Sequence, residues 1–325
     1  MKPIAVLGAG AFGTALAIAF AATGRTVFLW ARDAAAVQEM EARRQNARYL
    51  PDIRFPKTLN VIADLRALPM DALQVLAVPA QQTAAFLDAH GQHLPDAPLV
   101  LTAKGIDLTQ SALLTEIFTD SLPNRRVAVL SGPGFAGEIA RGLPTALSLG
   151  CQDDVLGAQL QERLSTPKIR LYRTRDIIGV QLGGALKNVV ALACGMCDGA
   201  ALGDSARAAL MTRGFAEMAR LGVAMGAEAE TFNGLSGLGD LALTCSTPHS
   251  RNFAAGQALG KAGQITPGLT VEGVSTAHAV LALANRFSVE MPIAEAVSHV
   301  LEGKLAIDAV MSRLLARPLK EESIG

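Results

Sequence analysis

Residues 4–24 read IAVLGAGAFGTALAIAFAATG, and this stretch decides the fold of the first half of the chain. Its first four residues are apolar and predict a buried strand, whereas the small apolar residues after Gly13 predict a helix. Between them stand Gly8, Gly10 and Gly13 in the spacing GxGxxG. We interpret the first glycine as permitting a tight turn, the second as admitting a pyrophosphate close to the backbone, and the third as letting helix and strand pack closely.

The glycine pattern predicts a dinucleotide site because of where it stands. GxGxxG alone is weak evidence, but the motif requires a strand before it and a helix after it, and both are expected here. The N-terminus of the helix would then face the phosphates and attract their charge. A purely structural turn is the alternative interpretation.

Further short apolar runs predict more strands in the first half of the chain. They are Thr26–Trp30, Leu73–Val78, Leu99–Ala103, Val127–Ser131, Thr145–Leu149 and Ile169–Tyr172. Helical patterns fill most gaps between the early runs, which predicts a mainly parallel sheet with helices on both faces. We therefore predict an α/β, doubly wound, Rossmann-type dinucleotide-binding domain at residues 1–176.

After about Asp176 the strand signals stop and long apolar helical patterns follow. These patterns are Ile177–Cys197, Ser205–Met225, Ala254–Lys261, Thr276–Arg286 and Ile293–Glu302. A polar, glycine-rich stretch at Asn233–Asn252 interrupts them and is expected to be a loop. We therefore predict an all-α C-terminal domain at residues 177–325, which would bind the substrate.

Composition excludes several classes of partner. The 325 residues have a formal net charge of zero, so no broad attraction to nucleic acid or anionic lipid is expected, and an anionic ligand needs a local site. Ile177–Cys197 is long enough to span a bilayer, but Gln181, Lys187 and Asn188 lie in its middle, where polar groups are costly. We expect no stable membrane insertion, and, since the chain opens on a strand rather than a secretory signal, a cytoplasmic location.

No metal site is expected from the cysteines and histidines. Cys194 and Cys197 have the spacing CxxC, but they lie on a helical pattern without a second pair of ligands. His90 and His93 stand in a polar loop. We interpret the cysteines as small core residues.

The second predicted strand ends in VFLWARD, which bears on the choice of cofactor. An acidic residue closing this strand would hold the ribose hydroxyls of NAD, whereas a small residue followed by arginine leaves room for a 2′-phosphate and pairs with it. Ala31 and Arg32 match the second arrangement, while Asp33 falls about where the acid is expected. Arg32 stacked on adenine is a further option. We predict NADPH or NADH as the cofactor, with NADPH favoured and dual use left open.

Two more polar segments follow predicted strands, where doubly wound folds bind their ligands. Lys104 comes just after one strand in LVLTAKG. Gly132, Gly134 and Ala136 come after another in VLSGPGFAGE, and their small size would let a cofactor approach closely. A solvated turn is the alternative for each segment.

The segment LSGLGDLALTCSTPHSRNF combines a carboxylate with a candidate anion clamp. Asp240 stands in a glycine-bracketed turn among apolar residues, where an unpaired carboxylate is expensive, so a cationic partner is expected. Ser250, Arg251 and Asn252 precede a helical pattern, and a hydroxyl, a guanidinium and an amide at a helix N-terminus would bind a phosphate or carboxylate. The alternative is that Ser250 or Asn252 only caps the helix.

Lys187 is the one obligatory charge within Ile177–Cys197. On a helix, Gly183 and Gly184 fall one turn before it, so its face is nearly bare and a ligand or a second backbone could approach. Lys187 could pair with Asp240, extend to solvent, or act as a desolvated acid with a lowered pKa. The residues alone leave these three options open.

Taken together, the motifs resemble the bacterial NAD(P)-dependent glycerol-3-phosphate dehydrogenases. The matching motifs, in this order and spacing, are GAGAFGTALA, LWARD, TAKG, SGPGFAGEIARGLPTA, GVQLGGALKNVVALACGMCDG, TRGFAEMARLG, GLSGLGDLALTC, SRN and VEG. The resemblance runs from about Ile4 to beyond Pro292, and the combination of LGGALKN, GLGDL and SRN is its most specific part.

The resemblance implies a reaction and a set of residue roles. The family reduces dihydroxyacetone phosphate, a small phosphorylated three-carbon substrate, to sn-glycerol 3-phosphate for glycerophospholipid synthesis, and a homodimer is expected. Lys187 would exchange the proton at the substrate oxygen, Lys104 would line substrate and nicotinamide, and Asp240 would orient the lysines or the substrate. The implied substrate-binding residues are Lys104, Gly132, Gly134, Lys187, Asp240, Ser250, Arg251 and Asn252. The implied cofactor-binding residues are Gly8, Gly10, Ala11, Phe12, Gly13, Arg32, Lys104, Ala136, Arg251, Thr270 and Glu272.

The sequence departs from the family pattern at four of these positions. Gly134 stands where Ser or Thr is common, so a hydroxyl contact is lost or replaced by water or backbone, and Ala11 stands where Ser is frequent, which costs a possible hydrogen bond to phosphate. Phe12 replaces Trp or Tyr and keeps an aromatic face, and Thr270 replaces Val. These changes bear on affinity rather than on the type of reaction.

Two other functions remain as alternatives. A related β-hydroxyacid dehydrogenase with the same two domains would act on another hydroxy or sugar acid, but a carboxylate-only substrate would not need Ser250, Arg251 and Asn252 together. A protein that senses NAD(P) without turnover would have no reason to keep Lys104 and Lys187 with Asp240.

Overall fold

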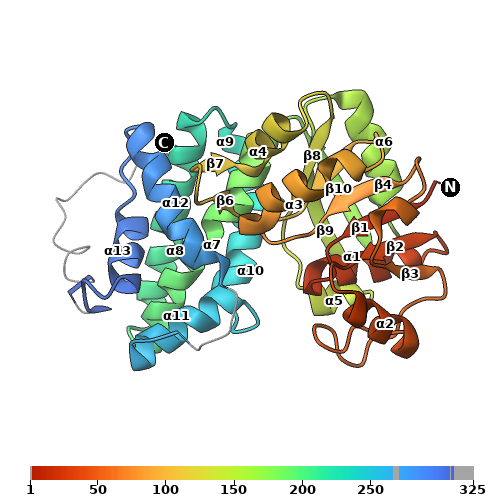
Figure 1. Cartoon of the computed structure of the whole chain (residues 1–325). Coiled ribbons are helices and arrows are strands. Elements are labelled where there is room, and N and C mark those ends of the chain that lie inside the picture. Colours follow the sequence, from red (N-terminus) through yellow and green to blue (C-terminus); the bar gives the residue numbers. More distant parts are fainter. Residues whose placement is uncertain (1, 266–270, 308, 311–325) are drawn as a thin grey trace. The chain divides into compact units, whose positions relative to one another are not determined.

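The computed structural model describes residues 2–265, 271–307 and 309–310, and the chain divides into two compact units (Figure 1). The first unit comprises Met1–Ala103 and Leu114–Ile177. The second comprises Lys104–Leu113 and Ile178–Gly325. The linear division at residue 176 therefore misplaces residues 104–113. This segment forms the short antiparallel pair β6 (Ile106–Asp107) and β7 (Ala112–Leu113), and buried Ile106 and Leu113 join the core of the second unit.

The described part of the first unit contains an eight-stranded sheet in the order β10-β9-β8-β5-β4-β1-β2-β3. The strands are β1 (Ile4–Leu7), β2 (Val27–Trp30), β3 (Leu59–Ile62), β4 (Leu73–Leu76), β5 (Leu99–Leu101), β8 (Val127–Ser131), β9 (Thr145–Gly150) and β10 (Ile169–Thr174). Neighbours are parallel except β8 and β9, which are antiparallel. The predicted mainly parallel sheet is confirmed. Sequence reasoning missed β3, an edge strand of four residues whose Asn60 is exposed.

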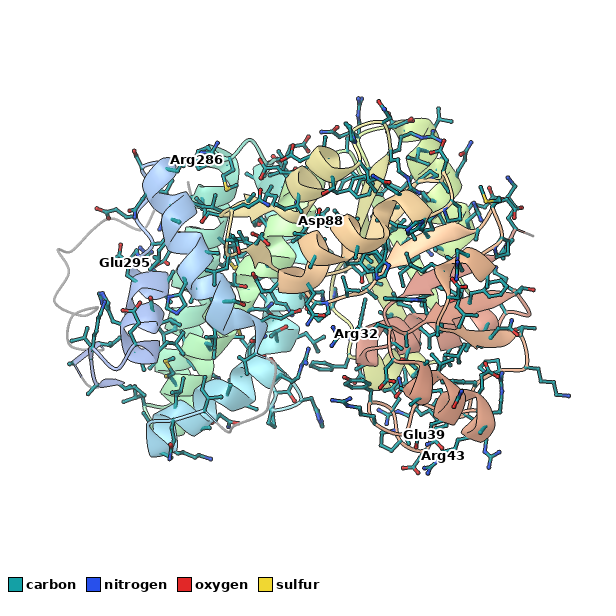
Figure 2. All side chains as sticks on the ribbon, in the orientation of Figure 1. Arg32, Glu39, Arg43, Asp88, Arg286 and Glu295 are labelled. Atoms are coloured by element: carbon teal, nitrogen blue, oxygen red, sulfur yellow. The ribbon has the colours of Figure 1, made fainter. Side chains whose placement is uncertain are left out.

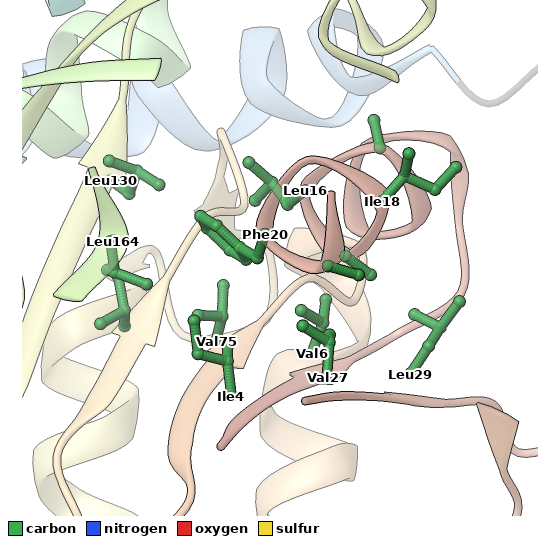
Figure 3. Close-up of a cluster of buried hydrophobic side chains, with 14 of the residues drawn as sticks. Ile4, Val6, Leu16, Ile18, Phe20, Val27, Leu29, Val75, Leu130 and Leu164 are labelled. Atoms are coloured by element: carbon green, nitrogen blue, oxygen red, sulfur yellow. The ribbon is translucent and has the colours of Figure 1, made fainter. Parts of the chain in front are cut away.

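The helices of the first unit are α1 (Ala11–Ala21), α2 (Ala34–Arg43), α3 (Thr83–His90), α4 (Leu114–Ser121), α5 (Ala136–Ala140) and α6 (Asp154–Leu164). Helix α1 lies against β1 and β2, as Figure 3 shows. Its Leu16 and Phe20 are fully buried in one cluster with Val6 and Val27 of those strands. Burying such side chains is worth roughly 1.5–3 kcal/mol each, so this packing holds α1 against the sheet.

The second unit is helical apart from β6 and β7, over the residues that the structure describes. Its helices are α7 (Ile177–Gly199), α8 (Asp204–Ala224), α9 (Ala229–Asn233), α10 (Asp240–Cys245), α11 (Arg251–Ala262), α12 (Glu272–Arg286) and α13 (Pro292–Leu301), with a π-helical turn at Leu235–Gly239. The predicted helices are confirmed to within a few residues at most ends. The glycine-rich stretch is not the expected loop throughout, because the π-helical turn and α10 lie inside it. Gly237 makes this turn possible, since a Cβ atom there would collide with the Phe232 carbonyl.

Helix α7 is the central helix of the second unit. By length and composition it is apolar enough to cross a membrane, but 94% of its most apolar window is buried inside the structure. Gly195 lets it approach α11, because a Cβ atom at this position would collide with the Phe253 carbonyl. The apolar composition of α7 is therefore accounted for by its place in a protein core.

Candidate active site

The three glycines of the first turn have three different surroundings. Gly8 has a φ of +126°, and a Cβ atom there would lie 2.6 Å from the Ala77 carbonyl oxygen. A Cβ atom at Gly13 would collide with the Gly8 carbonyl, whereas one at Gly10 would meet nothing within 4 Å. Gly8 and Gly13 are thus required by the fold, and the open space at Gly10 suits close approach of a ligand to the backbone.

The N-terminus of α1 follows Gly10 directly. Gly10 is the N-cap residue of α1, and as a glycine it has no side chain that could accept a hydrogen bond from the helix. Ala11 and Phe12, two of the predicted cofactor contacts, are the first two residues of α1 and are partly buried. The first N–H groups of a helix lack partners within the helix, so this end suits a phosphate.

Arg32 and Asp33 follow β2, and the structure gives them different surroundings. Asp33 is the N-cap of α2, where its carboxylate accepts hydrogen bonds from the backbone N–H groups of Ala35 at 3.0 Å and Ala36 at 3.4 Å. Arg32 is exposed (Figure 2). The same Asp33 oxygen accepts both bonds, so a ribose hydroxyl would have to compete with the cap or bind the other oxygen.

The loop after β8 is closely packed at both predicted glycines. Gly132 has a φ of +140°, and a Cβ atom there would lie 3.1 Å from Leu147 Cα. At Gly134 a Cβ atom would lie 3.1 Å from side-chain carbons of both Ile139 and Thr145. The glycine at position 134 therefore has a packing reason, since a hydroxyl-bearing residue would crowd these two side chains. Ala136 begins α5.

In the second unit, Asp240 joins two lysines that lie far apart in the sequence. Lys104 Nζ is 2.7 Å from Asp240 Oδ2, and Lys187 Nζ of α7 is 2.9 Å from Asp240 Oδ1. Asp240 is 1% exposed and begins α10. The cationic partner expected for this carboxylate is present twice, but Asp240 stands on a helix rather than in the turn that we expected.

Thr244 is a fourth member of this cluster, and sequence reasoning missed it. One helical turn after Asp240, its hydroxyl accepts a hydrogen bond from Lys187 Nζ at 2.6 Å and donates one to Asp240 Oδ1 at 3.3 Å. The spacing of four residues would have placed both side chains on one helix face, had the segment been assigned to a helix. We call Lys104, Lys187, Asp240 and Thr244 the lysine–aspartate cluster.

The pKa values of Lys187 and Asp240 both lie below their ordinary values, but for different reasons. Burial lowers the pKa of Lys187 below its ordinary value, Asp240 opposes this shift, and the positive charge of Lys104 adds to it. Burial by itself would raise the pKa of Asp240, but the charges and hydrogen bonds of Lys104 and Lys187 outweigh burial and hold that pKa below its usual range. Asp240 is therefore an anion at neutral pH, and the lowered pKa means that protonated Lys187 gives up its proton more readily than an exposed lysine does.

The bare face around Lys187 has a structural explanation at Gly183. A Cβ atom at Gly183 would lie 2.7 Å from the Ser236 carbonyl oxygen. Of the two approaches that the bare face allows, a ligand or a second backbone, the structure shows the second at Gly183. Gly183 lets the π-helical turn pack against α7, and this packing brings the following α10, with Asp240, toward Lys187.

Two asparagines tie the backbone of Lys104 to the start of α12. Asn188 Nδ2 donates to the Lys104 carbonyl at 3.2 Å, and Asn252 Nδ2 donates to Asn188 Oδ1 at 2.8 Å. The N–H of Gly273 donates to Asn252 Oδ1 at 2.9 Å. Asn188, which follows Lys187 in the sequence, was not among the predicted site residues. The side-chain amide of Asn252 is engaged within the protein.

The other residues predicted to bind the phosphate or the cofactor in the second unit, where described, lie at the N-terminal ends of α11 and α12. Ser250 is buried and caps α11, accepting the N–H of Phe253 at 3.2 Å, while Arg251 is exposed. Burial raises the pKa of Glu272, although Arg251 and the two lysines of the cluster act in the opposite direction. The predicted cofactor residue Thr270 lies outside the described residues.

Among the described residues, no group of three or more His, Cys, Asp or Glu side chains could hold a metal ion. Cys151, Cys194, Cys197 and Cys245 are free and buried. The glycine turn suits an anionic dinucleotide, and the lysine–aspartate cluster can hold and release a proton.

Comparison with known families decides which chemistry this is. The profile described as the NAD-dependent glycerol-3-phosphate dehydrogenase N-terminus matches residues 3–156, and the one described as the C-terminus of the same enzyme matches residues 176–312. This chain belongs to the NAD-dependent glycerol-3-phosphate dehydrogenase family. As a member of this family it is an NAD(P)-dependent oxidoreductase that acts on a CH–OH group.

Relatives within the glycerol-3-phosphate dehydrogenase family cover nearly the whole chain. The glycerol-3-phosphate dehydrogenase [NAD(P)+] of Ruegeria sp. (strain TM1040) is 49% identical over 319 residues, which make up 98% of this chain and 99% of the relative. The protein of the same name from Parvibaculum lavamentivorans is 46% identical and is matched over 99% of this chain and 98% of its own length. The predicted resemblance is confirmed.

Solved structures agree with this membership. The crystal structure of glycerol-3-phosphate dehydrogenase from Coxiella burnetii superimposes with a TM-score of 0.91 at 39% identity, over 97% of this chain and 99% of that one. A D-mandelate dehydrogenase shares the fold at 17% identity with a TM-score of 0.62, over 94% of this chain and 98% of that one. The predicted combination of a Rossmann-type α/β domain and a helical domain is confirmed.

Proposed function

We propose that Lys187 supplies the proton when this chain reduces dihydroxyacetone phosphate to sn-glycerol 3-phosphate with NADPH or NADH. The observation that carries the proposal is the setting of its ammonium group. An ammonium has three N–H donors, and among the described residues Asp240 and Thr244 accept two of them. One donor is left for a substrate oxygen.

The roles within the lysine–aspartate cluster follow from charge. Negative charge develops on the carbonyl oxygen of the substrate during reduction, and a nearby ammonium stabilises that charge before it gives up its proton. The burial that lowers the pKa of Lys187, together with the charge of Lys104, favours this transfer. Asp240 holds both ammonium groups in place, and Thr244 fixes the direction of the Lys187 N–H bonds.

A dinucleotide fits the glycine turn, because the space at Gly10 is open and no side chain of the N-cap residue caps α1. When bound, the nicotinamide cofactor supplies the hydride. We propose that the first unit binds it through residues from four places in the chain: Gly8 and Gly10, the start of α1 (Ala11, Phe12, Gly13), Arg32, and Ala136. The proposed contacts from the second unit are Lys104, Arg251, Thr270 and Glu272.

We propose that Arg251 binds the phosphate of the substrate. Its side chain is exposed at the first turn of α11, where the helix N-terminus adds to the attraction for an anion. Ser250 and Asn252 are buried and hydrogen-bonded within the protein, so their part is to shape this end of α11 around the phosphate. The proposed lining of the substrate also includes Gly132 and Gly134.

NADPH is the proposed preferred cofactor. The exposed Arg32 side chain can pair with a 2′-phosphate, whereas the Asp33 carboxylate, which would favour NADH, accepts two hydrogen bonds from α2. We further propose a cytoplasmic enzyme that acts as a homodimer and supplies glycerol 3-phosphate for glycerophospholipid synthesis.

One assay tests the proposed substrate and cofactor together. Oxidation of NADPH and of NADH is followed at fixed enzyme concentration with dihydroxyacetone phosphate and, in parallel, with a panel of carboxylate-bearing ketones. We expect kcat/KM for dihydroxyacetone phosphate to exceed that of any carboxylate ketone by at least about a hundredfold, because the Arg251 end is built for a phosphate. A higher kcat/KM for a carboxylate ketone would instead support a related hydroxyacid dehydrogenase.

A further inference from the structure

The buried side chain of Asn46, which is not among the predicted site residues, is hydrogen-bonded to the glycine turn. Asn46 lies in the segment between α2 and β3 and is 4% exposed. Its Nδ2 donates one hydrogen bond to the Ala9 carbonyl at 3.0 Å and another to Thr14 Oγ1 at 2.9 Å. Ala9 precedes Gly10, and Thr14 follows Gly13. One amide group therefore fastens both ends of the turn.

The bond to Ala9 fixes the direction of a peptide plane in the turn. Because a trans peptide is planar, its C=O and N–H bonds point in opposite directions. With the Ala9 carbonyl held toward Asn46, the N–H of Gly10 must point away from Asn46. Gly10 has no Cβ atom to restrict the rotation of this peptide, so an outside restraint is needed to keep it in one orientation.

The same arrangement leaves the helix N-terminus available. An ordinary N-cap side chain accepts a hydrogen bond from an early N–H of the helix and so occupies the group that a phosphate would use. Gly10 provides no such cap for α1. Asn46 stabilises the turn by donating to oxygen atoms only, so its contacts do not consume any N–H of α1.

The backbone around Asn46 is itself well held. Arg44 has a φ of +51° and donates to the carbonyls of Pro56 at 2.9 Å and Leu59 at 2.6 Å. The N–H of Phe55 donates to the Arg44 carbonyl at 2.7 Å, and the N–H of Leu50 donates to the carbonyl of Asn46 at 2.9 Å. These bonds anchor the segment to the start of β3, so the direction of the Asn46 side chain is fixed by the fold.

We propose that Asn46 is a positioning residue for the cofactor: it holds the Gly8–Gly13 turn in the shape that presents N–H groups to the pyrophosphate of the dinucleotide. The inference rests on the part of the proposed function in which the glycine turn binds NAD(P). Asn46 acts through Ala9 and Thr14 and need not touch the cofactor. Its loss should therefore weaken cofactor binding without changing the chemistry at Lys187.

The test compares Asn46→Leu with Gln74→Met, because each exchange removes a buried amide and keeps the approximate size of the side chain. Gln74 lies in β4 of the same sheet, is fully buried, and donates to the Pro95 carbonyl at 2.8 Å, away from the turn. We measure Kd for NADPH by nicotinamide fluorescence, KM for both substrates, kcat, and the melting temperature. Asn46→Leu should raise Kd and KM for NADPH about tenfold or more, with kcat and the KM for dihydroxyacetone phosphate at saturating NADPH within about twofold of wild type.

Gln74→Met should lower the melting temperature but leave Kd for NADPH unchanged. Equal effects of the two variants on Kd would overturn the proposal, since the loss would then reflect stability alone. An unchanged Kd in Asn46→Leu would overturn it as well. Because Kd is measured without the ketone, these outcomes stay separate from a failure to reduce dihydroxyacetone phosphate, which would count against the proposed reaction.

Thr14 gives a second pair of variants in case Asn46→Leu does not fold. Thr14→Val removes the hydroxyl that accepts from Asn46, whereas Thr14→Ser keeps it. Thr14→Val should raise Kd for NADPH about threefold to tenfold, and Thr14→Ser should restore it to within about twofold of wild type. If both variants bound NADPH as wild type does, the Asn46 contact with Thr14 would have no part in positioning the turn.

Discussion

In the proposed function, the glycine turn and the lysine–aspartate cluster handle a charged ligand in opposite ways. The turn offers backbone and empty space: its defining residues have no side chains, and Gly10 faces open space. The cluster offers side chains with full charges, brought together from positions 104, 187 and 240. A site made of backbone fixes where a ligand lies, whereas a site made of buried ionisable groups can also exchange a proton with it.

The largest effect is expected from the cluster. Lys187→Met removes the proposed proton donor but keeps most of the apolar volume of the side chain, so kcat should fall by about 10³-fold or more, while Kd for NADPH stays within about threefold. Steady-state kinetics and a fluorescence titration measure the two quantities. Lys261→Met, which removes an exposed lysine of α11, is the matched control and should be silent. A Lys187 variant that keeps kcat would remove this lysine from the acid-base step.

This contrast also explains how far the sequence could lead. The glycine turn was predictable because its pattern is local: strand, turn and helix follow one another within 21 residues, at positions 4–24. The cluster was not local, since Lys187 and its acceptor Thr244 are 57 residues apart, and Asn188 and Asn252 are 64 apart. The residues alone pointed to Lys104, Lys187 and Asp240, and the family resemblance gave them roles, but neither pointed to Thr244 or Asn188.

The remaining errors have physical causes in packing. Residues 104–113 follow a strand of the first unit in the sequence, but burial of Ile106 and Leu113 draws them into the core of the second. The LSGLGD segment reads as a loop because glycine is a poor helix former. Close contacts at Gly183 and Gly237, which no local pattern reveals, make glycine the residue that fits there.

A second buried carboxylate shows what the charged partners of the cluster contribute. Glu217 of α8 is 3% exposed and accepts N–H bonds from Ile293 at 2.8 Å and Ala294 at 3.4 Å at the start of α13. Among the residues that the structure describes, no lysine pairs with Glu217 as two do with Asp240, and burial raises the pKa of Glu217 to about 7. Burial thus determines the direction of the pKa shift at Glu217, whereas the two lysines determine it at Asp240.

The difference predicts a pH dependence of stability. The pKa of Glu217 is about 7 in the folded state against 4.5 without the fold, so folding favours the protonated form. The stability that this provides is complete below about pH 4.5 and is lost as the pH rises toward 7, by about 3 kcal/mol. Glu217→Gln should therefore remove this loss, and its stability relative to wild type should rise between pH 5 and pH 8.

Urea unfolding at several pH values measures this effect, and Glu230→Gln, which changes an exposed residue of α9, is the control. Parallel pH profiles of wild type and Glu217→Gln would contradict the raised pKa. They would also weaken the comparison with Asp240, because burial would then not be the force that the lysines of the cluster overcome.

The Arg251→Ala variant tests whether the second unit binds the phosphate of the substrate in addition to its proposed part in proton transfer. Arg251→Ala should raise KM for dihydroxyacetone phosphate by about thirtyfold to a hundredfold, since a charge-assisted contact to phosphate is lost. Arg286→Ala, on an exposed residue at the end of α12 (Figure 2), should leave KM unchanged. Unchanged kinetics in Arg251→Ala would leave the substrate phosphate without its proposed partner.

The smallest change in kcat/KM is expected at Arg32, which tests how the glycine turn is supplemented by side chains. The turn itself cannot distinguish NADPH from NADH, because both have the same pyrophosphate, so the choice must lie in side chains beyond it. Arg32→Ala should lower kcat/KM for NADPH about tenfold and that for NADH less than about twofold, because only NADPH carries the 2′-phosphate. Arg43→Ala, which breaks a surface pair with Glu39 at the other end of α2, should change neither. An equal loss with both cofactors would show that Arg32 acts on the adenine that NADPH and NADH share. The choice of cofactor would then depend on Asp33, which the Asp33→Asn variant tests because it keeps the N-cap of α2 and removes the charge.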